Sequence, residues 1–270
     1  TGRWSVLKIP TMSFYEYCKL LELEEPELPK GIRISELVSM SHAELGDLIS
    51  RFSSLQNHFN RYLTIGGFPE LVLSDDDLYA QRMLREDVVD KVIKRDVLTL
   101  FNIRSPLLME KLFLYLCMNS TEIFNATTAA KELENTSVAT IDSYIHALEM
   151  SNLIYLAKGA LKGRPKIFIA DAAIRNAVLM VDDVLSDERE LGAMVETAIY
   201  KHIVSFYQGS TAQLGYFRKA KDNQKEVDVV IELPRQKILC EVKYRNNSHV
   251  PMTDAIVELC QDEKAKVTTA

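Results

Sequence analysis

The most informative part of the chain is residues 226–244, EVDVVIELPRQKILCEVKY. Two runs that alternate in polarity flank a Leu-Pro-Arg-Gln turn, which predicts a β-hairpin. Residues two apart in a strand point to the same side, so Glu226 and Asp228 share one face, as do Glu241 and Lys243. The opposite face is apolar and is the predicted core side, formed by Val227, Val229, Ile231, Ile238, Cys240, Val242 and Tyr244. The hairpin is therefore expected to gather acids and a lysine on one side of a sheet.

These residue types suit hydrolysis of a phosphodiester bond, which needs a hard cation, an activated water and positive charge near the developing oxyanion. Asp228 and Glu241 are the predicted Mg²⁺ ligands, with the backbone carbonyl of Val242 as a third. Lys243 is expected to orient the attacking water or to stabilise the transition state. Upstream, Glu196 borders the apolar stripe of a helix and is expected to reach over the sheet toward the metal. The simpler alternative is an ordinary hairpin with cross-strand ion pairs on its outer face.

Length and composition limit what the chain can be. With 270 residues, 47% of them hydrophobic, it can bury more than one core, so two or three domains are expected. The net charge is -6 and the pI is near 5.5, which excludes a global basic field for nucleic acid. Binding of DNA would need a local basic patch, and the candidate residues are Lys219, Lys221, Lys225, Lys243 and Arg245. The alternative is that these side chains are ordinary solvated surface charges.

The cysteines and histidines favour neither disulfides nor zinc. Four cysteines occur without a Cys-x-x-Cys pair, three of them in apolar settings, which indicates reduced thiols and a cytoplasmic location. The five histidines form no ligand cluster, and a histidine on an apolar helix, such as His146, is more often a packed residue than a metal ligand. There is no signal-peptide pattern and no apolar run long enough to span a bilayer, so no membrane partner is expected. The chain begins with Thr1 and a strand-like piece up to Pro10, from which we expect a fragment that lacks an upstream portion.

Residues 11–104 have mostly helical patterns. Ser13 opens a short helix, and the apolar spacing over residues 42–63 predicts one amphipathic helix that stops at Gly66-Gly67. Another helical pattern covers residues 75–101. One interpretation of this region is a helical lid, with the two glycines as a hinge or, more simply, as a helix terminus.

Residues 105–186 have the pattern of a winged helix, in which three helices precede two strands joined by a basic tip. The expected elements are helices over 106–118 and 127–133, a third helix that Ser137 caps and that runs to Met150, and strands over 153–157 and 166–170. The third helix should bury Val138, Ile141, Ile145 and Leu148 and expose Thr140, Asp142, Ser143, His146 and Glu149. Because that exposed face holds neither Arg nor Lys, a packing role is favoured over reading of DNA bases. The wing is the alternative DNA contact, through Lys158, Lys162, Arg164 and Lys166.

Residues 187–270 change to a mixed helix and strand pattern. The expected order is a helix to residue 208, strands over 213–218, 225–232 and 237–244, a helix over 253–260 and a strand that begins at Lys264. This αβββαβ order predicts a three-layer α/β arrangement around a small mixed sheet.

Several short stretches together resemble the C-terminal part of a family of bacterial and archaeal AAA-type P-loop ATPases. They are residues 1–3 with 9–17, the Gly-Gly-Phe-Pro segment 62–70, the Arg-Asp segment 92–96, and the segments 226–228 and 241–243. In this family an ATPase domain is followed by a winged helix and a PD-(D/E)XK nuclease-like domain of unknown function. The resemblance covers nearly the full chain and implies a candidate catalytic site at Glu196, Asp228, Glu241 and Lys243. No Gly-x-x-x-x-Gly-Lys-Ser/Thr motif occurs here, so ATP is expected only in the missing upstream domain.

The expected protein is multidomain, α + α/β. Its parts are a remnant of the ATPase core with a helical linker (1–104), a winged helix-turn-helix (105–186) and a restriction-endonuclease-like αβββαβ domain (187–270). The favoured function is Mg²⁺-dependent cleavage of DNA, with metal at Asp228 and Glu241, under control of the upstream ATPase domain. The expected nucleic-acid contacts are Lys162, Arg164, Lys166, Lys225 and Arg245. The alternative is a non-catalytic regulatory module that binds nucleic acid or a protein partner, and assembly into a homo-oligomer is left open.

Overall fold

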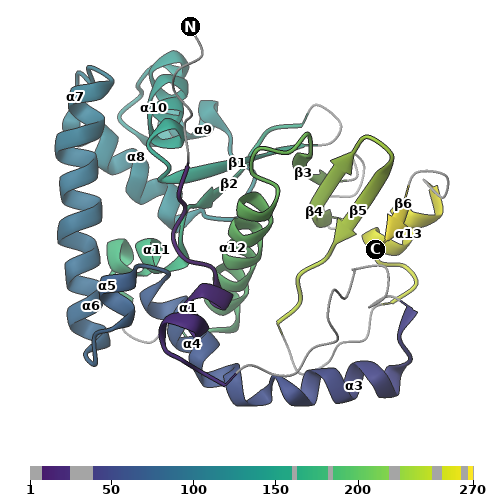
Figure 1. The fold of residues 1–270 in the computed structure, drawn as a ribbon. Helices are drawn as coiled ribbons and strands as arrows, with labels where there is room; N and C mark the ends of the chain where they lie inside the picture. The colour runs from purple at the N-terminus through teal and green to yellow at the C-terminus, as the bar shows by residue number, and fades with distance from the viewer. Residues whose placement is uncertain are drawn as a thin grey trace, which may run out of the picture.

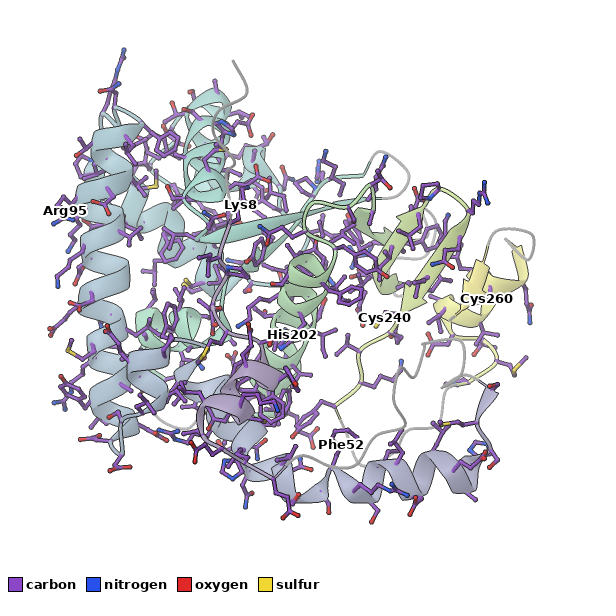
Figure 2. The ribbon with its side chains drawn as sticks, viewed as in Figure 1. Lys8, Phe52, Arg95, His202, Cys240 and Cys260 are labelled. Atoms are coloured by element: carbon purple, nitrogen blue, oxygen red, sulfur yellow. The ribbon has the colours of Figure 1, made fainter. Side chains whose placement is uncertain are left out.

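The fold is mixed α/β (Figure 1). The computed structural model describes residues 8–24, 39–159, 163–181, 185–218, 226–244, 251–262 and 267–269. In these ranges, none of the helices combines the length and the hydropathy that crossing a membrane requires. The four cysteines are free thiols. Cys18 and Cys117 are buried, whereas Cys240 and Cys260, which Figure 2 labels, are partly exposed.

The first helices form where the sequence places caps. Helix α1 (Phe14–Leu20) starts with a capping box, in which Ser13 accepts the Glu16 N–H and Glu16 accepts the Ser13 N–H. The single helix predicted for residues 42–63 is wrong, because the chain divides it into α3 (His42–Arg51), a 3₁₀ turn η1 (Ser53–Leu55) and α4 (Gln56–Ile65). At the break, the N–H of Phe52 bonds to the carbonyl of Ile49, as in a tightened last turn. No residue of α3 is buried, whereas α4 buries Tyr62, Leu63 and Ile65.

The helical pattern predicted for residues 75–101 is confirmed. Helix α5 (Pro69–Val72) comes first, and α6 (Asp77–Met83), η2 (Leu84–Val97) and α7 (Leu98–Leu100) then follow one another without a break, with π-type hydrogen bonding in η2. Together, α6, η2 and α7 form the long helix at the left of Figure 1. The strand-like piece expected up to Pro10 is not a strand in residues 8–10, and its first seven residues lie outside the described ranges.

The three helices and two strands expected in the middle of the chain are present. They are α8 (Pro106–Met118), α9 (Ala126–Glu132), α10 (Val138–Met150), β1 (Ile154–Gly159) and β2 (Lys166–Ile169), with β1 and β2 antiparallel. Ser105, Asn125 and Ser137 cap the three helices through their side chains. One side-chain prediction for α10 is wrong, because Val138 is exposed rather than buried. His146 is exposed, as the assignment of the two helix faces predicted. Helix α11 (Ala172–Leu179), which was not predicted, follows β2 and packs against η2, α4 and α8.

The last part of the chain follows the expected αβββαβ order. Its elements are α12 (Glu188–Phe206), β3 (Gln213–Arg218), β4 (Glu226–Leu233), β5 (Gln236–Cys240), α13 (Ala255–Asp262) and β6 (Val267–Thr269). These strands continue the hairpin of the middle region in one six-stranded sheet of order β2-β1-β3-β4-β5-β6. The junction is a short parallel pairing, in which Lys158 lies opposite Gly215. A Cβ at Gly215 would collide with the Lys158 carbonyl, so this junction needs glycine.

Helices cover both faces of this sheet. On one face, Tyr200 of α12 stacks on Phe168 of β2 with ring centroids 4.1 Å apart, beside Val229 and Ile231 of β4. On the other face, α13 packs on a second cluster that contains Val227, Val230 and Leu239. Helix α12 also packs against α1 and α4 through Met194, Val195 and Ala198, so it stands between the N-terminal helices and the sheet (Figure 1).

The predicted β4–β5 hairpin is confirmed, with two corrections. Leu233 pairs with Gln236 around a two-residue turn, but β5 ends at Cys240 and does not extend to Tyr244. The predicted apolar face is also divided, because Val227 and Val229 pack in clusters on opposite sides of the sheet. The pairing of β3 with β4 shifts register between Gly215 and Phe217. At this point the side chains of β4 no longer alternate regularly between the two faces of the sheet.

Candidate functional site

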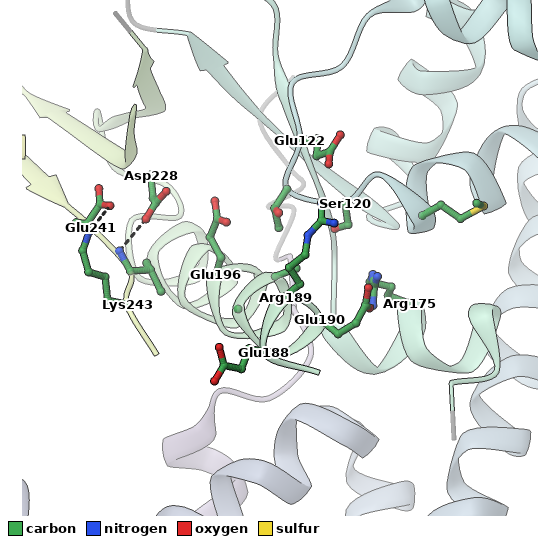
Figure 3. A pocket seen from close by; sticks show the side chains of 15 residues that line it. Ser120, Glu122, Arg175, Glu188, Arg189, Glu190, Glu196, Asp228, Glu241 and Lys243 are labelled. Carbon is green, nitrogen blue, oxygen red and sulfur yellow. Dashed lines mark hydrogen bonds and ion pairs between the residues drawn. The ribbon is translucent and has the colours of Figure 1, made fainter. Parts of the chain in front are cut away.

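The four residues expected to form a catalytic site line one pocket. This pocket has a volume of about 600 Å³, and its walls include Glu196, Asp228, Glu241 and Lys243. Figure 3 shows Asp228 between Glu196 and Glu241, with the three carboxyl groups on the same side of the ribbon. The first turns of α12 close the other side of the pocket, through Glu188, Arg189, Glu190, Gly192 and Ala193.

The four residues reach the pocket from three parts of the chain. Glu196 lies in the middle of α12, and Asp228 lies near the start of β4, at the register shift. Glu241 and Lys243 were expected on a strand, but they lie in the segment that follows β5. Asp228 fixes that segment, because its Oδ2 accepts the N–H of Val242 at 2.7 Å. The hydrogen bond from Val242 to the Asp228 side chain therefore follows directly after the last backbone pairing of β4 with β5.

Lys166 is the residue that the sequence misassigned. It was expected on an exposed wing as a contact to nucleic acid, but its side chain is only 5% exposed. Its Nζ lies 2.6 Å from Glu196 Oε1 and 2.6 Å from Glu226 Oε1, and 3.9 Å from Asp228 Oδ1. Burial of an ammonium is unfavourable unless carboxylates surround it, which explains this position. The surface contact predicted for Lys166 is therefore wrong.

A second lysine, Lys243, lines the pocket beside Glu241. Lys243 Nζ donates to Glu241 Oε1 at 3.0 Å and to Asp254 Oδ2 at 3.1 Å. The second oxygen of Glu241, Oε2, is buried and has no hydrogen-bond partner among the described residues. A buried carboxylate oxygen without a donor is unfavourable unless a cation or water binds to it. Glu241 thus keeps one oxygen available for a ligand.

Burial and mutual repulsion perturb these acids. Burial raises the pKa of Glu196 from 4.5 to about 7, and the neighbouring Asp228 and Glu226 act in the same direction against the charge of Lys166. Burial likewise raises the pKa of Asp228, although the Val242 N–H and Lys166 oppose it. Burial and the charge of Asp228 raise the pKa of Glu241. All three acids would be more easily ionised if a further cation were bound.

The donor set fits a magnesium ion held by few protein ligands. Within the described ranges, no group of three or more His, Cys, Asp or Glu is arranged to hold a metal. Mg²⁺ keeps several waters and commonly takes only one or two carboxylates from a protein. Asp228 and Glu241 supply that number, and the unpartnered Glu241 Oε2 is a suitable oxygen. Glu196 is less available than expected because Lys166 holds it.

The other predicted nucleic-acid contacts are only partly described. Arg164 is exposed next to the β1–β2 connection. Lys162, Lys225 and Arg245 lie outside the described residues.

Three residues of the site were not predicted as members: Glu226 and Asp254, which hold the two lysines, and Arg218, whose Nε lies 3.0 Å from Glu226 Oε2. The strand alternation already placed Glu226 beside Asp228. No sequence pattern connects Arg218 or Asp254 to the pocket.

Comparison with known proteins adds two domain matches. Residues 56–185 match a domain of unknown function (DUF8612), and residues 191–270 match another domain of unknown function (DUF4143). No curated protein and no solved structure matches the chain. Lys166 falls in the first matched region, whereas Glu196, Asp228, Glu241 and Lys243 all fall in the second. The chain is thus similar to two domain families in tandem. Residues of both matched regions line the pocket, such as Glu122 of the first and Glu196 of the second.

Proposed function

We propose that the pocket around Asp228 and Glu241 is a Mg²⁺-dependent phosphodiesterase site that cleaves DNA. The observation that carries the proposal is the convergence of Glu196, Asp228, Glu241 and Lys243 on one pocket from α12, β4 and the segment after β5. Perturbed carboxylates and a lysine in a polar cleft are what such chemistry requires. The αβββαβ order of residues 187–270 supports a restriction-endonuclease-like fold for this part.

Asp228 and Glu241 would hold the ion, with the Val242 carbonyl as a third donor. When bound, Mg²⁺ would polarise the phosphate and lower the pKa of a water. Lys243, held between Glu241 and Asp254, would face the phosphate and stabilise the charge that develops on its oxygens. The Val242 N–H keeps Asp228 oriented throughout. Glu196, with its pKa raised to about 7, is suited to take up a proton near neutral pH.

The partners proposed are DNA and an upstream ATPase domain, and the location proposed is the cytoplasm. The second matched domain occurs in AAA-ATPase-associated proteins, which supports an ATPase in the parent protein. The three helices and two strands of residues 106–169 support a winged helix in the middle. Because β1 and β2 belong to the common sheet, movement of this module would reach the pocket directly.

A non-catalytic regulatory module is the second candidate, and a specific observation favours it. Lys166 already neutralises two of the carboxylates, as it would in a site that has replaced its metal by a permanent cation. Such a domain would bind nucleic acid or a protein without hydrolysing it.

Calorimetric titration with Mg²⁺ and Mn²⁺ separates these candidates. We expect wild-type protein to bind the ion, and Asp228→Asn and Glu241→Gln to lose most of the binding. Glu232→Gln is the matched control, because Glu232 lies on the same strand as Asp228 but is exposed and does not line the pocket. The enzyme proposal fails if wild type binds neither ion, and DNA binding without metal would then support the regulatory module.

A further inference from the structure

Lys166 lies in a network of ion pairs that borders the pocket. Among the described residues, this network and that of Lys243 include five carboxylates, those of Glu196, Glu226, Asp228, Glu241 and Asp254. Three cations bind them: Lys166, Arg218 and Lys243. The distribution of these three cations decides where a divalent ion can bind.

Lys166 binds two of these acids, Glu196 and Glu226, and not Glu241. Its ammonium bridges Glu196 and Glu226 at 2.6 Å to each, the distance of a charge-assisted hydrogen bond. Arg218 holds the other oxygen of Glu226 at 3.0 Å. Neither acid then offers a free pair of oxygens to a metal. Asp228 and Glu241 are better placed to bind a metal, because Lys166 approaches Asp228 no closer than 3.9 Å and Glu241 Oε2 has no hydrogen-bond partner among the described residues.

The position of this ammonium is fixed by the fold. Lys166 is the first residue of β2, where it pairs with Ala157 of β1, and Ile123 also bridges to it. Its Nζ lies 5.8 Å from the centre of the Phe168 ring and 6.0 Å from that of Tyr216. These two rings belong to the core between the sheet and α12. The stem is therefore held on several sides, and the ammonium cannot leave without disturbing the core.

We propose that Lys166 is a built-in cation that occupies the second metal position of this site, so that the site binds one divalent ion, at Asp228 and Glu241. This inference rests on the proposed function. Lys166 is a positioning residue, since it acts on substrate only through the acids that it holds. It also makes the second matched region dependent on the first, because residues 191–270 carry the acids but not this cation.

The test is the number of Mn²⁺ ions bound per chain, measured by calorimetry and by electron paramagnetic resonance of free Mn²⁺. Wild type is expected to bind one. Lys166→Met, which frees Glu196 and Glu226, is expected to bind two, or to bind the first ion about tenfold more tightly. Lys158→Met is the matched control, because Lys158 lies on the neighbouring strand β1 and is exposed; it is expected to behave as wild type.

Two further measurements keep the inference open to refutation. If Lys166→Met does not fold without metal, Mn²⁺ is expected to restore its folding and to give a melting transition. A double variant Lys166→Met/Glu226→Gln is expected to fold and to bind one ion. Two ions in wild type would overturn the inference, as would a Lys166→Met protein with the stoichiometry and affinity of wild type. No binding by wild type would instead overturn the proposed function on which it rests.

Discussion

Lys201 and Asp171 form an ion pair inside the protein, with Nζ of the lysine 2.8 Å from Oδ2 of the aspartate and the two side chains 2% and 3% exposed. The same ammonium donates to the Thr11 hydroxyl and to the Met12 carbonyl. Asp171 also caps α11 and accepts the Gly67 N–H. One buried network therefore joins α12, the start of α11 and the segment before α1. Helix α12 carries Glu196, so this network helps to hold one wall of the pocket.

Replacing Lys201 should strongly reduce the stability of the folded protein. Lys201→Met leaves Asp171 charged and buried, and we expect a loss of about 3 kcal/mol in the free energy of unfolding, measured with urea. The loss should fall at the lower end for broken buried pairs, because three donors to Asp171 remain. Asp47→Asn, which breaks the exposed pair with Arg51, should change stability by less than about 0.5 kcal/mol. Equal effects of the two substitutions would contradict the assigned role.

Gly67 is needed for a close backbone approach. The Met12 N–H bonds to the Gly67 carbonyl at 2.8 Å, and a Cβ at Gly67 would collide with the backbone of Met12. We expect Gly67→Ala to destabilise the protein by about 2 kcal/mol or more in urea unfolding. Gly46→Ala is the control, since nothing lies near its added Cβ within α3, and it should be neutral or slightly stabilising. A neutral Gly67→Ala would show that the segment before α1 does not pack as described.

The raised pKa of Glu196 has a definite effect on stability. Its pKa rises from 4.5 to about 7 on folding, so the folded state holds the proton more tightly than the unfolded state. Glu196 therefore favours folding least when it is ionised, and stability should decrease as pH rises from about 4.5 through 7. In metal-free buffer, we expect wild type to lose about 2 kcal/mol relative to Glu196→Gln over this range. Urea unfolding at several pH values measures this loss. If the free energy of unfolding depended on pH in the same way for both proteins, the raised pKa of Glu196 would be refuted.

Much of the local structure could be predicted from the sequence. The bounds of α8, α10 and β3 agree with the prediction because caps or turn residues define them, such as Ser105 before Pro106 and Ser137 before Val138. The β4–β5 hairpin was predictable from alternation around Pro234 and Arg235. Such signals are local, so one sequence is sufficient to find them.

The failures concern contacts between residues far apart in the sequence. Lys166 follows a basic tip in the sequence. No nearby residue indicates that β1 will pair with β3, which brings Lys166 into contact with Glu196 and Glu226. The end of β5 at Cys240 depends on Asp228, which takes the Val242 N–H from a different strand. The network around Lys201 and Asp171 likewise joins three parts of the chain that are far apart in sequence. Glu196, Asp228, Glu241 and Lys243 were predictable by residue type, but the roles of Lys166, Arg218 and Asp254 as their ion-pair partners were not.

The most direct test of the proposed function is cleavage of supercoiled plasmid DNA by the purified chain in Mg²⁺ or Mn²⁺, compared with the same reaction in EDTA. We expect nicking that requires the metal, that falls by at least about 100-fold in Asp228→Asn and in Glu241→Gln, and that persists in Glu232→Gln. Absence of metal-dependent nicking in wild type, or equal rates for wild type and Asp228→Asn, would contradict a phosphodiesterase site at this pocket.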